Sequence, residues 1–202
     1  MAVNESIGFR TTINDGLPAY IWFVSPGQIN LQVPTDAKTG PVTVTVKTSN
    51  EMASTSAMLA PFAPSFSLLD GKHVAGIILR SDGSGAYGGG SYDILGPTGS
   101  SIGYPTVAAK AGDSVVLFGV GFGPTNPPVP AGRAYSGAAP VTMPVGLTIG
   151  ETAVIPAFAG ISGAGLYQVN VIVPIGLSSG DVSLLATAGG MFTPSNVVIS
   201  LQ

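Results

Sequence analysis

Residues 28–33 read Gln28-Ile29-Asn30-Leu31-Gln32-Val33, a strict alternation of polar and apolar side chains. Successive side chains of a β-strand point to opposite faces, so this stretch gathers its apolar residues on one face. Residues 42–46 read Val42-Thr43-Val44-Thr45-Val46 and keep the alternation with β-branched side chains, which suit a pleated surface. The two stretches predict two strands of one hairpin unit, separated by a proline stop and a turn.

The rest of the chain keeps this period of two. Gly and Pro, 29 and 17 residues, interrupt nearly every candidate helix, and no long window carries the helical apolar spacing cleanly. Many short strands between turn residues predict an all-β sandwich or barrel. The further strand candidates are Gly8–Ile13, Ala19–Val24, Ser56–Ala60, Ser65–Leu69, Val74–Arg80, Ser114–Gly119, Val145–Ile149, Thr152–Phe158, Leu166–Val173, Val182–Thr187 and Asn196–Leu201.

An internal repeat appears when the chain is shifted by 140 residues. Gln28–Pro34 then falls on Gln168–Pro174, and Gly40 falls on Gly180. The prolines end their strands, because proline cannot donate a hydrogen bond to the sheet. We expect the glycines to lie in turns that need a positive φ. The repeat predicts two similar sandwiches in tandem.

The expected domains are residues 1–95 and residues 104–202. The stretch 96–103, Gly96-Pro97-Thr98-Gly99-Ser100-Ser101-Ile102-Gly103, has the composition of a surface linker between them. A boundary near residue 62 is the alternative.

One difference between the copies suggests an incomplete first sandwich. An early strand, Ser114–Gly119, precedes the second copy, and the first copy has no counterpart. We therefore expect residues 65–95 or a neighbouring chain to supply the missing strands. An incomplete sandwich exposes a strand edge, and such an edge permits self-association by strand addition.

The repeated segments also resemble a bacterial family. Ser25–Pro34 and Gly165–Pro174 resemble its "VSPxQINxQVP" signature, Gly112–Pro124 resembles its "GDxVxLYxTGLGP", and Ser195–Val198 resembles its closing "SNxVxL". The chain thus resembles the Solibacter uncharacterised C-terminal domain family, abundant in acidobacteria and similar to the IPT/TIG immunoglobulin-like domains. The resemblance covers most of the chain and implies two tandem immunoglobulin-like sandwiches that close a longer exported protein. It implies no catalytic residues.

Composition excludes several classes of protein. The 202 residues include no Cys, one His, seven Lys and Arg, and a net charge of −3. Disulfides, Cys-containing zinc sites and two-histidine catalysis are therefore excluded, and a nucleic-acid surface is disfavoured because it needs many cations. No apolar run is long enough for a membrane helix. Residues 1–6 lack a basic and an apolar region, so they form no signal peptide. The protein is therefore either cytosolic or a piece of a longer exported or cell-surface chain, and the composition, with 8% charged residues and no Cys, favours the second.

Three features of the sequence bear on catalysis or metal binding. Gly99–Gly103 matches the G-x-S-x-G pattern of hydrolases, but His73 precedes it and a linker is the favoured interpretation. Gly119–Gly123 resembles a dinucleotide loop, but prolines follow in place of a helix, so close packing is favoured. We interpret His73 as a solvent-exposed strand-edge residue.

No cofactor is expected. Calcium is the most plausible metal, because it prefers oxygen ligands, and Asp70, Asp82 and Asp93 are weak candidates for binding it. The favoured interpretation of these aspartates is a role in turns.

Aromatic side chains are the candidate ligand-binding residues. Tyr20 and Trp22 stand two apart on one expected strand and so share a face. They form either a stacking platform for a sugar or, as we favour, core or inter-domain contacts. Tyr87, Tyr92 and Tyr104 form a second cluster, which either binds a ligand or covers a small core.

Together these features predict a non-catalytic module for adhesion, docking or spacing. Its expected partners are other domains of a longer chain, a surface protein or a polysaccharide. A carbohydrate-binding module that uses exposed aromatics is the alternative. A glycoside hydrolase that uses a carboxylate pair is the weakest hypothesis.

Overall fold

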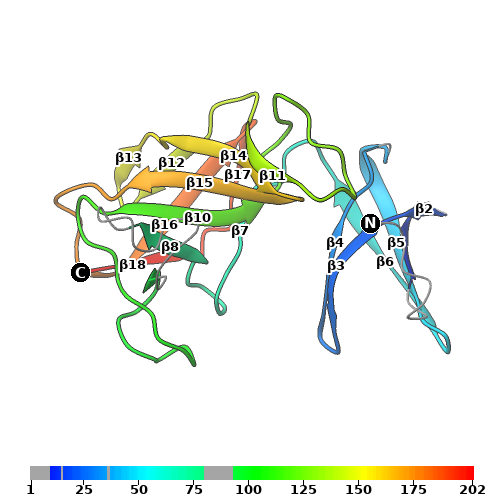
Figure 1. The fold of residues 1–202 in the computed structure, drawn as a ribbon, viewed down its shortest axis with the longest axis horizontal. Coiled ribbons are helices and arrows are strands. Elements are labelled where there is room, and N and C mark those ends of the chain that lie inside the picture. The colour runs from blue at the N-terminus through cyan, green and yellow to red at the C-terminus, as the bar shows by residue number, and fades with distance from the viewer. Residues whose placement is uncertain (1–9, 15, 36, 80–92) are drawn as a thin grey trace.

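The computed structural model describes residues 10–14, 16–35, 37–79 and 93–202. This part of the chain is all-β and contains antiparallel sheets without a helix (Figure 1). Within it, no helix is long and apolar enough to cross a membrane. The strands gather into a small N-terminal unit and a larger C-terminal unit.

The N-terminal unit, residues 10–59, consists of a four-stranded sheet and a hairpin. The sheet has the order β2-β1-β5-β6, and the hairpin is β3–β4. Its buried core is small: Ile13, Ala19 and Val42, with Leu31 and Leu59 packed against them. The bounds are β1 Arg10–Ile13, β2 Leu17–Pro18, β3 Tyr20–Ser25, β4 Gln28–Gln32, β5 Gly40–Lys47 and β6 Met52–Leu59.

The C-terminal unit has two sheets around one large core. The first sheet has the order β11-β14-β15-β10-β8-β9, with β7 also paired to β10. Its strands are β7 Ser65–Phe66, β8 Gly76–Leu79, β9 Asp93–Ile94, β10 Ser114–Val120, β11 Ser136–Pro140, β14 Phe158–Gly163 and β15 Leu166–Ile172. The second sheet has the order β13-β12-β16-β17, with β18 also paired to β16. Its strands are β12 Gly146–Ile149, β13 Thr152–Val154, β16 Gly180–Ala188, β17 Met191–Phe192 and β18 Val198–Leu201.

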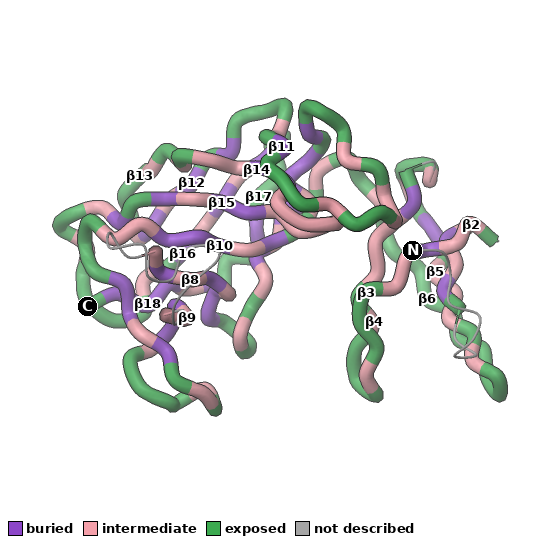
Figure 2. Tube along the Cα trace, in the orientation of Figure 1, coloured by how far each residue is buried: buried purple, intermediate pink, exposed green. Residues whose placement is uncertain are grey.

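Both sheets of this unit contribute to the same core. Leu117 and Val169 from the first sheet belong to one cluster of buried side chains with Ile149, Leu184 and Ile199 from the second. Figure 2 shows the buried residues concentrated in this unit. The alternation in strands such as β16 produces this arrangement, because every second side chain points between the sheets.

The described part of residues 65–95 belongs to the C-terminal unit. β7 and β8 both pair with β10, and β9 pairs with β8. The expectation that residues 65–95 complete the N-terminal unit is therefore wrong for the described residues. The physical reason is that β10 pairs with β15 along one edge and needs partners for its other edge, and β7 and β8 supply them. Strand pairing changes units between β6 and β7, near residue 62.

The stretch 96–103 is not a connection between the units. Gly96 N donates to Val107 O at 3.0 Å, and Gly99 pairs with Thr106 in an antiparallel bridge. Both ends of the stretch therefore lie in the C-terminal unit, and the expected linker at this place is wrong. The Gly99–Gly103 motif forms a turn in which Gly103 N donates to Ser100 O at 3.1 Å.

The prolines of the repeated segments follow the ends of their strands, and the glycines begin the next strands. β4 ends at Gln32 and β15 at Ile172, each shortly before a proline. Gly40 has φ +116° and Gly180 has φ +102°, conformations that L side chains rarely adopt. Both glycines are the first residues of strands, β5 and β16, so the positive φ is confirmed but their expected place within turns is not.

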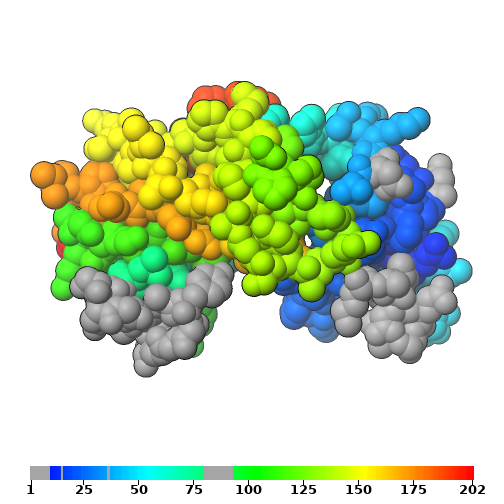
Figure 3. All heavy atoms as spheres, turned by 45° about the horizontal axis from the view of Figure 1, so that its top comes forward, coloured from blue at the N-terminus to red at the C-terminus, as the bar shows by residue number. Residues whose placement is uncertain are grey.

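The segment that connects the units, near residues 62–65, packs against Gly119, Gly121 and Gly123, which we call the glycine row. A Cβ at Gly121 would lie 2.1 Å from the Ala63 carbonyl oxygen, and one at Gly123 would lie 2.1 Å from the Phe62 ring. Ala63 N also donates to Gly121 O at 3.0 Å. Close packing, the favoured interpretation of Gly119–Gly123, is therefore present. Figure 3 shows the two units in contact across this region.

Candidate functional site

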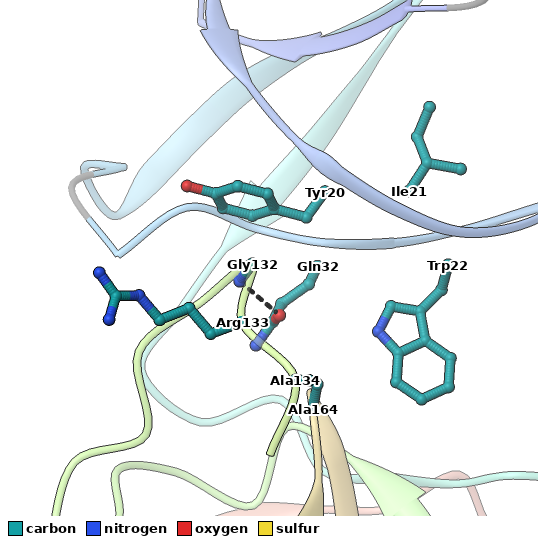
Figure 4. A pocket seen from close by; sticks show the side chains of 8 residues that line it. All are labelled: Tyr20, Ile21, Trp22, Gln32, Gly132, Arg133, Ala134 and Ala164. Atoms are coloured by element: carbon teal, nitrogen blue, oxygen red, sulfur yellow. Dashed lines mark hydrogen bonds between the residues drawn. The ribbon is translucent and has the colours of Figure 1, made fainter. Parts of the chain in front are cut away.

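A cleft of about 250 Å³ lies where the hairpin meets loops of the C-terminal unit. The hairpin supplies one wall, and the loop before β11 and the β14–β15 turn supply the other (Figure 4). The lining residues are Tyr20, Ile21, Trp22, Gln32, Gly132, Arg133, Ala134 and Ala164.

The aromatic wall comes from β3. Its pairing with β4 shifts register between Ile21 and Phe23, which places a bulge at Trp22. Figure 4 shows Tyr20 and Trp22 on the cleft side of the strand, with Ile21 pointing to the other side. The Trp22 side chain is 58% exposed, so a large part of its indole is accessible to a ligand.

Polar groups complete the cleft. Gln32 Oε1 accepts a hydrogen bond from Gly132 N at 3.0 Å, which joins the hairpin to the loop. The Tyr20 ring covers Gly132 so closely that a Cβ there would lie 2.2 Å from Cε1 of the ring. Arg133 is exposed at the rim. The cleft thus combines an open indole face with amide and guanidinium groups that form hydrogen bonds.

The sequence prediction for the aromatics is partly wrong. Trp22 is not a core residue, because it is 58% exposed, but it lines the cleft between the two units, so the interpretation as an inter-domain residue is not contradicted. Tyr20 is half-buried at the contact between the units. Tyr104 is half-buried in a C-terminal loop and does not line the cleft. Tyr87 and Tyr92 lie outside the described residues.

Sequence reasoning missed the polar side of this cleft. Gln32 lies on an ordinary alternating strand, and Gly132 and Arg133 lie 100 residues further along the chain. No local pattern connects them, because only the packing of the two units brings them together.

A second cluster surrounds His73. Its Nδ1 lies 2.7 Å from Asp70 Oδ2, and its Nε2 lies 3.2 Å from both carboxylate oxygens of Asp181. Lys72 Nζ donates to Asp181 Oδ2 at 2.6 Å, and Ser200 Oγ donates to Asp181 Oδ1 at 3.0 Å. Both ring nitrogens of the imidazole thus face a carboxylate.

These contacts shift the acid–base equilibria of the cluster. The backbone N–H groups of His73 and Lys72, and then the His73 ring, hold the pKa of Asp70 well below its ordinary value. The hydrogen bond from Lys72 lowers the pKa of Asp181, and the same bond raises the pKa of Lys72. The two carboxylates are therefore ionised at neutral pH and fix the imidazole between them.

The prediction of a solvent-exposed His73 is wrong. The residue is only 5% exposed, because β18 pairs alongside it and Asp181 reaches it from β16. Asp70 has the turn role that was favoured, since its Oδ1 accepts from Lys72 N at 2.9 Å and His73 N at 2.8 Å. Asp93 lies on β9 opposite Ile78, and Asp82 lies outside the described residues.

The cluster does not have the geometry of a metal site or of a nucleophilic triad. Among the residues that the structure describes, no group of three or more His, Cys, Asp or Glu side chains is arranged to hold a metal ion. Ser200 bonds to a carboxylate and not to the imidazole, so His73 is not placed to activate it. The contacts of His73 connect the Asp70 turn to β16 and are structural in kind.

No protein-family profile, curated protein or solved structure matches this chain.

Proposed function

We propose that this chain is a non-catalytic module that docks or spaces other parts of an exported bacterial protein. The observation that carries the proposal is the set of close contacts at the junction between its units. A spacer must hold its ends at a defined orientation, and a flexible linker does not do so.

The junction consists of contacts on both sides of the connecting segment. The Phe62 ring packs against the core of the C-terminal unit and against Gly123 and Gly189. On the other side, the Gln32–Gly132 hydrogen bond and the Tyr20 ring join the hairpin to the loop before β11. These contacts oppose rotation about residues 60–64 and favour a single arrangement of the two units.

The proposed architecture is a tandem repeat of immunoglobulin-like sandwiches, the second complete and the first reduced. Strand pairing supports it: Ile13 pairs with Val44 in β1–β5, and Ile149 pairs with Leu184 in β12–β16. Val44 and Leu184 are 140 positions apart, as the repeat requires. Hydrogen bonds support it too, since Gln28 Nε2–Asn30 Oδ1 and Gln168 Nε2–Asn170 Oδ1 are both 2.7 Å long.

Export and a surface location are proposed from the family resemblance and the low charge of the sequence. The absence of catalysis is proposed from the site geometry. Asp70 and Asp181 lie on opposite sides of the His73 ring, so they do not face each other across an open gap of the kind that glycoside hydrolysis needs.

A substitution in the glycine row tests the proposed spacer. Gly121→Ala places a Cβ against the Ala63 carbonyl at a backbone φ of +74°. We expect it to release the junction and to broaden the distance distribution measured by small-angle X-ray scattering. Gly112→Ala is the matched control, because it has a similar φ of +86° with nothing within 4 Å of the added Cβ.

Circular dichroism first establishes that both variants are folded. Their scattering then decides whether the glycine row holds the junction. Broadening in Gly121→Ala alone supports a junction held by the glycine row. Identical scattering from both variants and the unchanged protein contradicts it.

Carbohydrate recognition is a second candidate function, favoured by the exposure of Trp22. An accessible indole beside Gln32 and Arg133 offers a stacking face and hydrogen-bonding groups to a sugar ring. A module that only spaces other domains has no need of such a face. The ligand class proposed for the cleft is therefore a neutral or acidic saccharide.

A glycan and polysaccharide binding screen tests this candidate. We expect Trp22→Ala to weaken binding about tenfold, since one aromatic contact contributes roughly 0.5–1.5 kcal/mol beyond its buried area. Phe192→Ala is the control, because Phe192 is also exposed, at 65%, and does not line the cleft. Equal binding by both variants, or no binding in the screen, removes carbohydrate recognition and leaves docking or spacing.

A further inference from the structure

The strand β6 is an open edge with both faces uncovered. In the described part of the chain it pairs only with β5, and residues 52–58 are all exposed. Its counterpart at the end of the chain, β18, has three buried residues out of four. The difference arises because the β3–β4 hairpin is too narrow to cover β6. Ala53, Thr55 and Ala57, which share the face of Val42 and Val44, therefore meet solvent.

Other sheet edges among the described residues are protected. β2, β7, β9 and β17 have two residues each, and β13 has three. β11 has an irregular register and ends at Pro140, and β3 is bulged. The outer side of β18 receives parallel bridges from His73 and Ala109. Of the two regular edges that remain, β4 has five residues and β6 has eight. Long, regular edges without charge are the ones that pair with other strands.

The pairing of β5 with β6 indicates which backbone groups of β6 point outward. Thr48 N donates to Glu51 O at 2.8 Å beyond the end of the ladder, so Thr48 and Glu51 form a hydrogen-bonded pair. Hydrogen-bonded and non-bonded pairs alternate along an antiparallel ladder. The pairs Lys47–Met52, Thr45–Ser54, Thr43–Ser56 and Pro41–Met58 are therefore non-bonded ones. The N–H and C=O groups of Met52, Ser54, Ser56 and Met58 accordingly face the open edge.

The sequence of this edge is a palindrome. Residues 52–58 read Met52-Ala53-Ser54-Thr55-Ser56-Ala57-Met58, the same in both directions about Thr55. When two copies related by a two-fold axis pair these edges antiparallel, the palindrome places each residue opposite a residue of the same type in the other copy. With the axis at Thr55, each outward-facing residue of one copy opposes an outward-facing residue of the other. This register forms roughly eight inter-copy hydrogen bonds.

We propose that β6 pairs with β6 of a second copy of this chain, antiparallel and centred on Thr55. In this register, threonine opposes threonine and alanine opposes alanine on the inner face, and serine opposes serine and methionine opposes methionine on the outer face. Cross-strand Thr and Ser pairs are favourable, and the absence of charge on β6 removes like-charge repulsion. The four-stranded sheets of two copies thereby join into one continuous sheet.

The contact is of limited size, so the association is weak. Eight residues extend about 26 Å at roughly 3.3 Å per residue. A single shared edge of this length falls below the roughly 1,200 Å² that marks the low end of specific interfaces. The pairing therefore produces a reversible, concentration-dependent dimer.

Single-cysteine variants test the register, because the chain has no cysteine of its own. At the axis, Thr55 opposes Thr55 as a non-bonded pair with Cα atoms about 4.5 Å apart, within the range that a disulfide spans. We expect Thr55→Cys to form a disulfide-linked dimer rapidly under mild oxidation. Ala53→Cys and Ala57→Cys should cross-link slowly when alone and rapidly when mixed with each other. Equal rates for all of these samples overturn the register.

Sedimentation velocity over a wide concentration range tests the association itself. We expect Ser56→Lys, which adds a charge at the edge, to raise the dimer dissociation constant at least tenfold. Thr43→Lys is the matched control, because Thr43 lies directly opposite Ser56 one strand further in and is also exposed. The control should stay within about twofold of the unchanged protein. A chain that remains monomeric at several hundred micromolar, or equal effects of the two substitutions, overturns the proposal.

Discussion

At the scale of a single residue, the Asp70 side chain takes part in several hydrogen bonds of the cluster around His73. It accepts two backbone N–H bonds and a bond from His73, which in turn bonds Asp181 from a strand 108 residues away in sequence. The turn at Asp70 is thereby connected to β16, in the second sheet of the C-terminal unit. The His73 imidazole connects the two carboxylates. Because the ring is buried, the carboxylates of Asp70 and Asp181 are the hydrogen-bond partners of its two nitrogens.

Asp70→Asn provides a test of this network through its pH dependence. The folded state lowers the pKa of Asp70, so its contribution to stability is present above the ordinary value of 3.8 and is lost as the pH falls below it. At pH 7 we expect the variant to lose about 1 kcal/mol, because charge-assisted hydrogen bonds stabilise modestly at a partly exposed site. Urea denaturation between pH 7 and pH 2 should then show a smaller decline in the variant than in the unchanged protein. Parallel curves would contradict the assignment.

At the scale of the element, strand character follows from local alternation, and strand surroundings do not. β16 places Val182, Leu184 and Ala186 on one face, whereas both faces of β6 mix small or apolar side chains with hydroxyl-bearing ones. In β16 the inward residues are buried by the opposite sheet, whereas the same face of β6 has no covering layer. The self-pairing proposed for β6 depends on the absence of a covering layer beside that strand. The glycine row likewise depends on the close approach of residues 62–65.

At the scale of the whole molecule, the two units differ strongly in buried apolar surface. Among the described residues the N-terminal core has three buried side chains, and the C-terminal core has twenty. Since apolar burial is the main favourable contribution to folding, the smaller unit has much less of it. We therefore expect the two units to unfold separately, in which case a single free energy of unfolding does not describe the chain.

Native-state hydrogen exchange tests this difference in stability. We expect amides in the middle of β5 to exchange at least ten times faster than amides in the middle of β10 and β15, because they open with the weaker unit. The measurement is made well below the dimer dissociation constant, so that β6 pairing does not protect the N-terminal unit. Equal protection in both units would mean that the junction joins them into one cooperative structure.

The alternation of residues 28–33 and 42–46 was enough to predict β-strands at the right places, and Gly40 and Gly180 have the predicted positive φ. These features are local: side-chain period and backbone φ are properties of a few consecutive residues. The prediction that the two segments form one hairpin is wrong, because β4 pairs with β3, and β5 pairs with β1 and β6. The tertiary structure alone decided that the described part of residues 65–95 pairs with β10, that Trp22 is exposed, and that His73 lies between two carboxylates. Each of these depends on which distant edges and faces meet. A strand's backbone accepts many partners with similar hydrogen bonds, so its sequence does not specify the one that it finds.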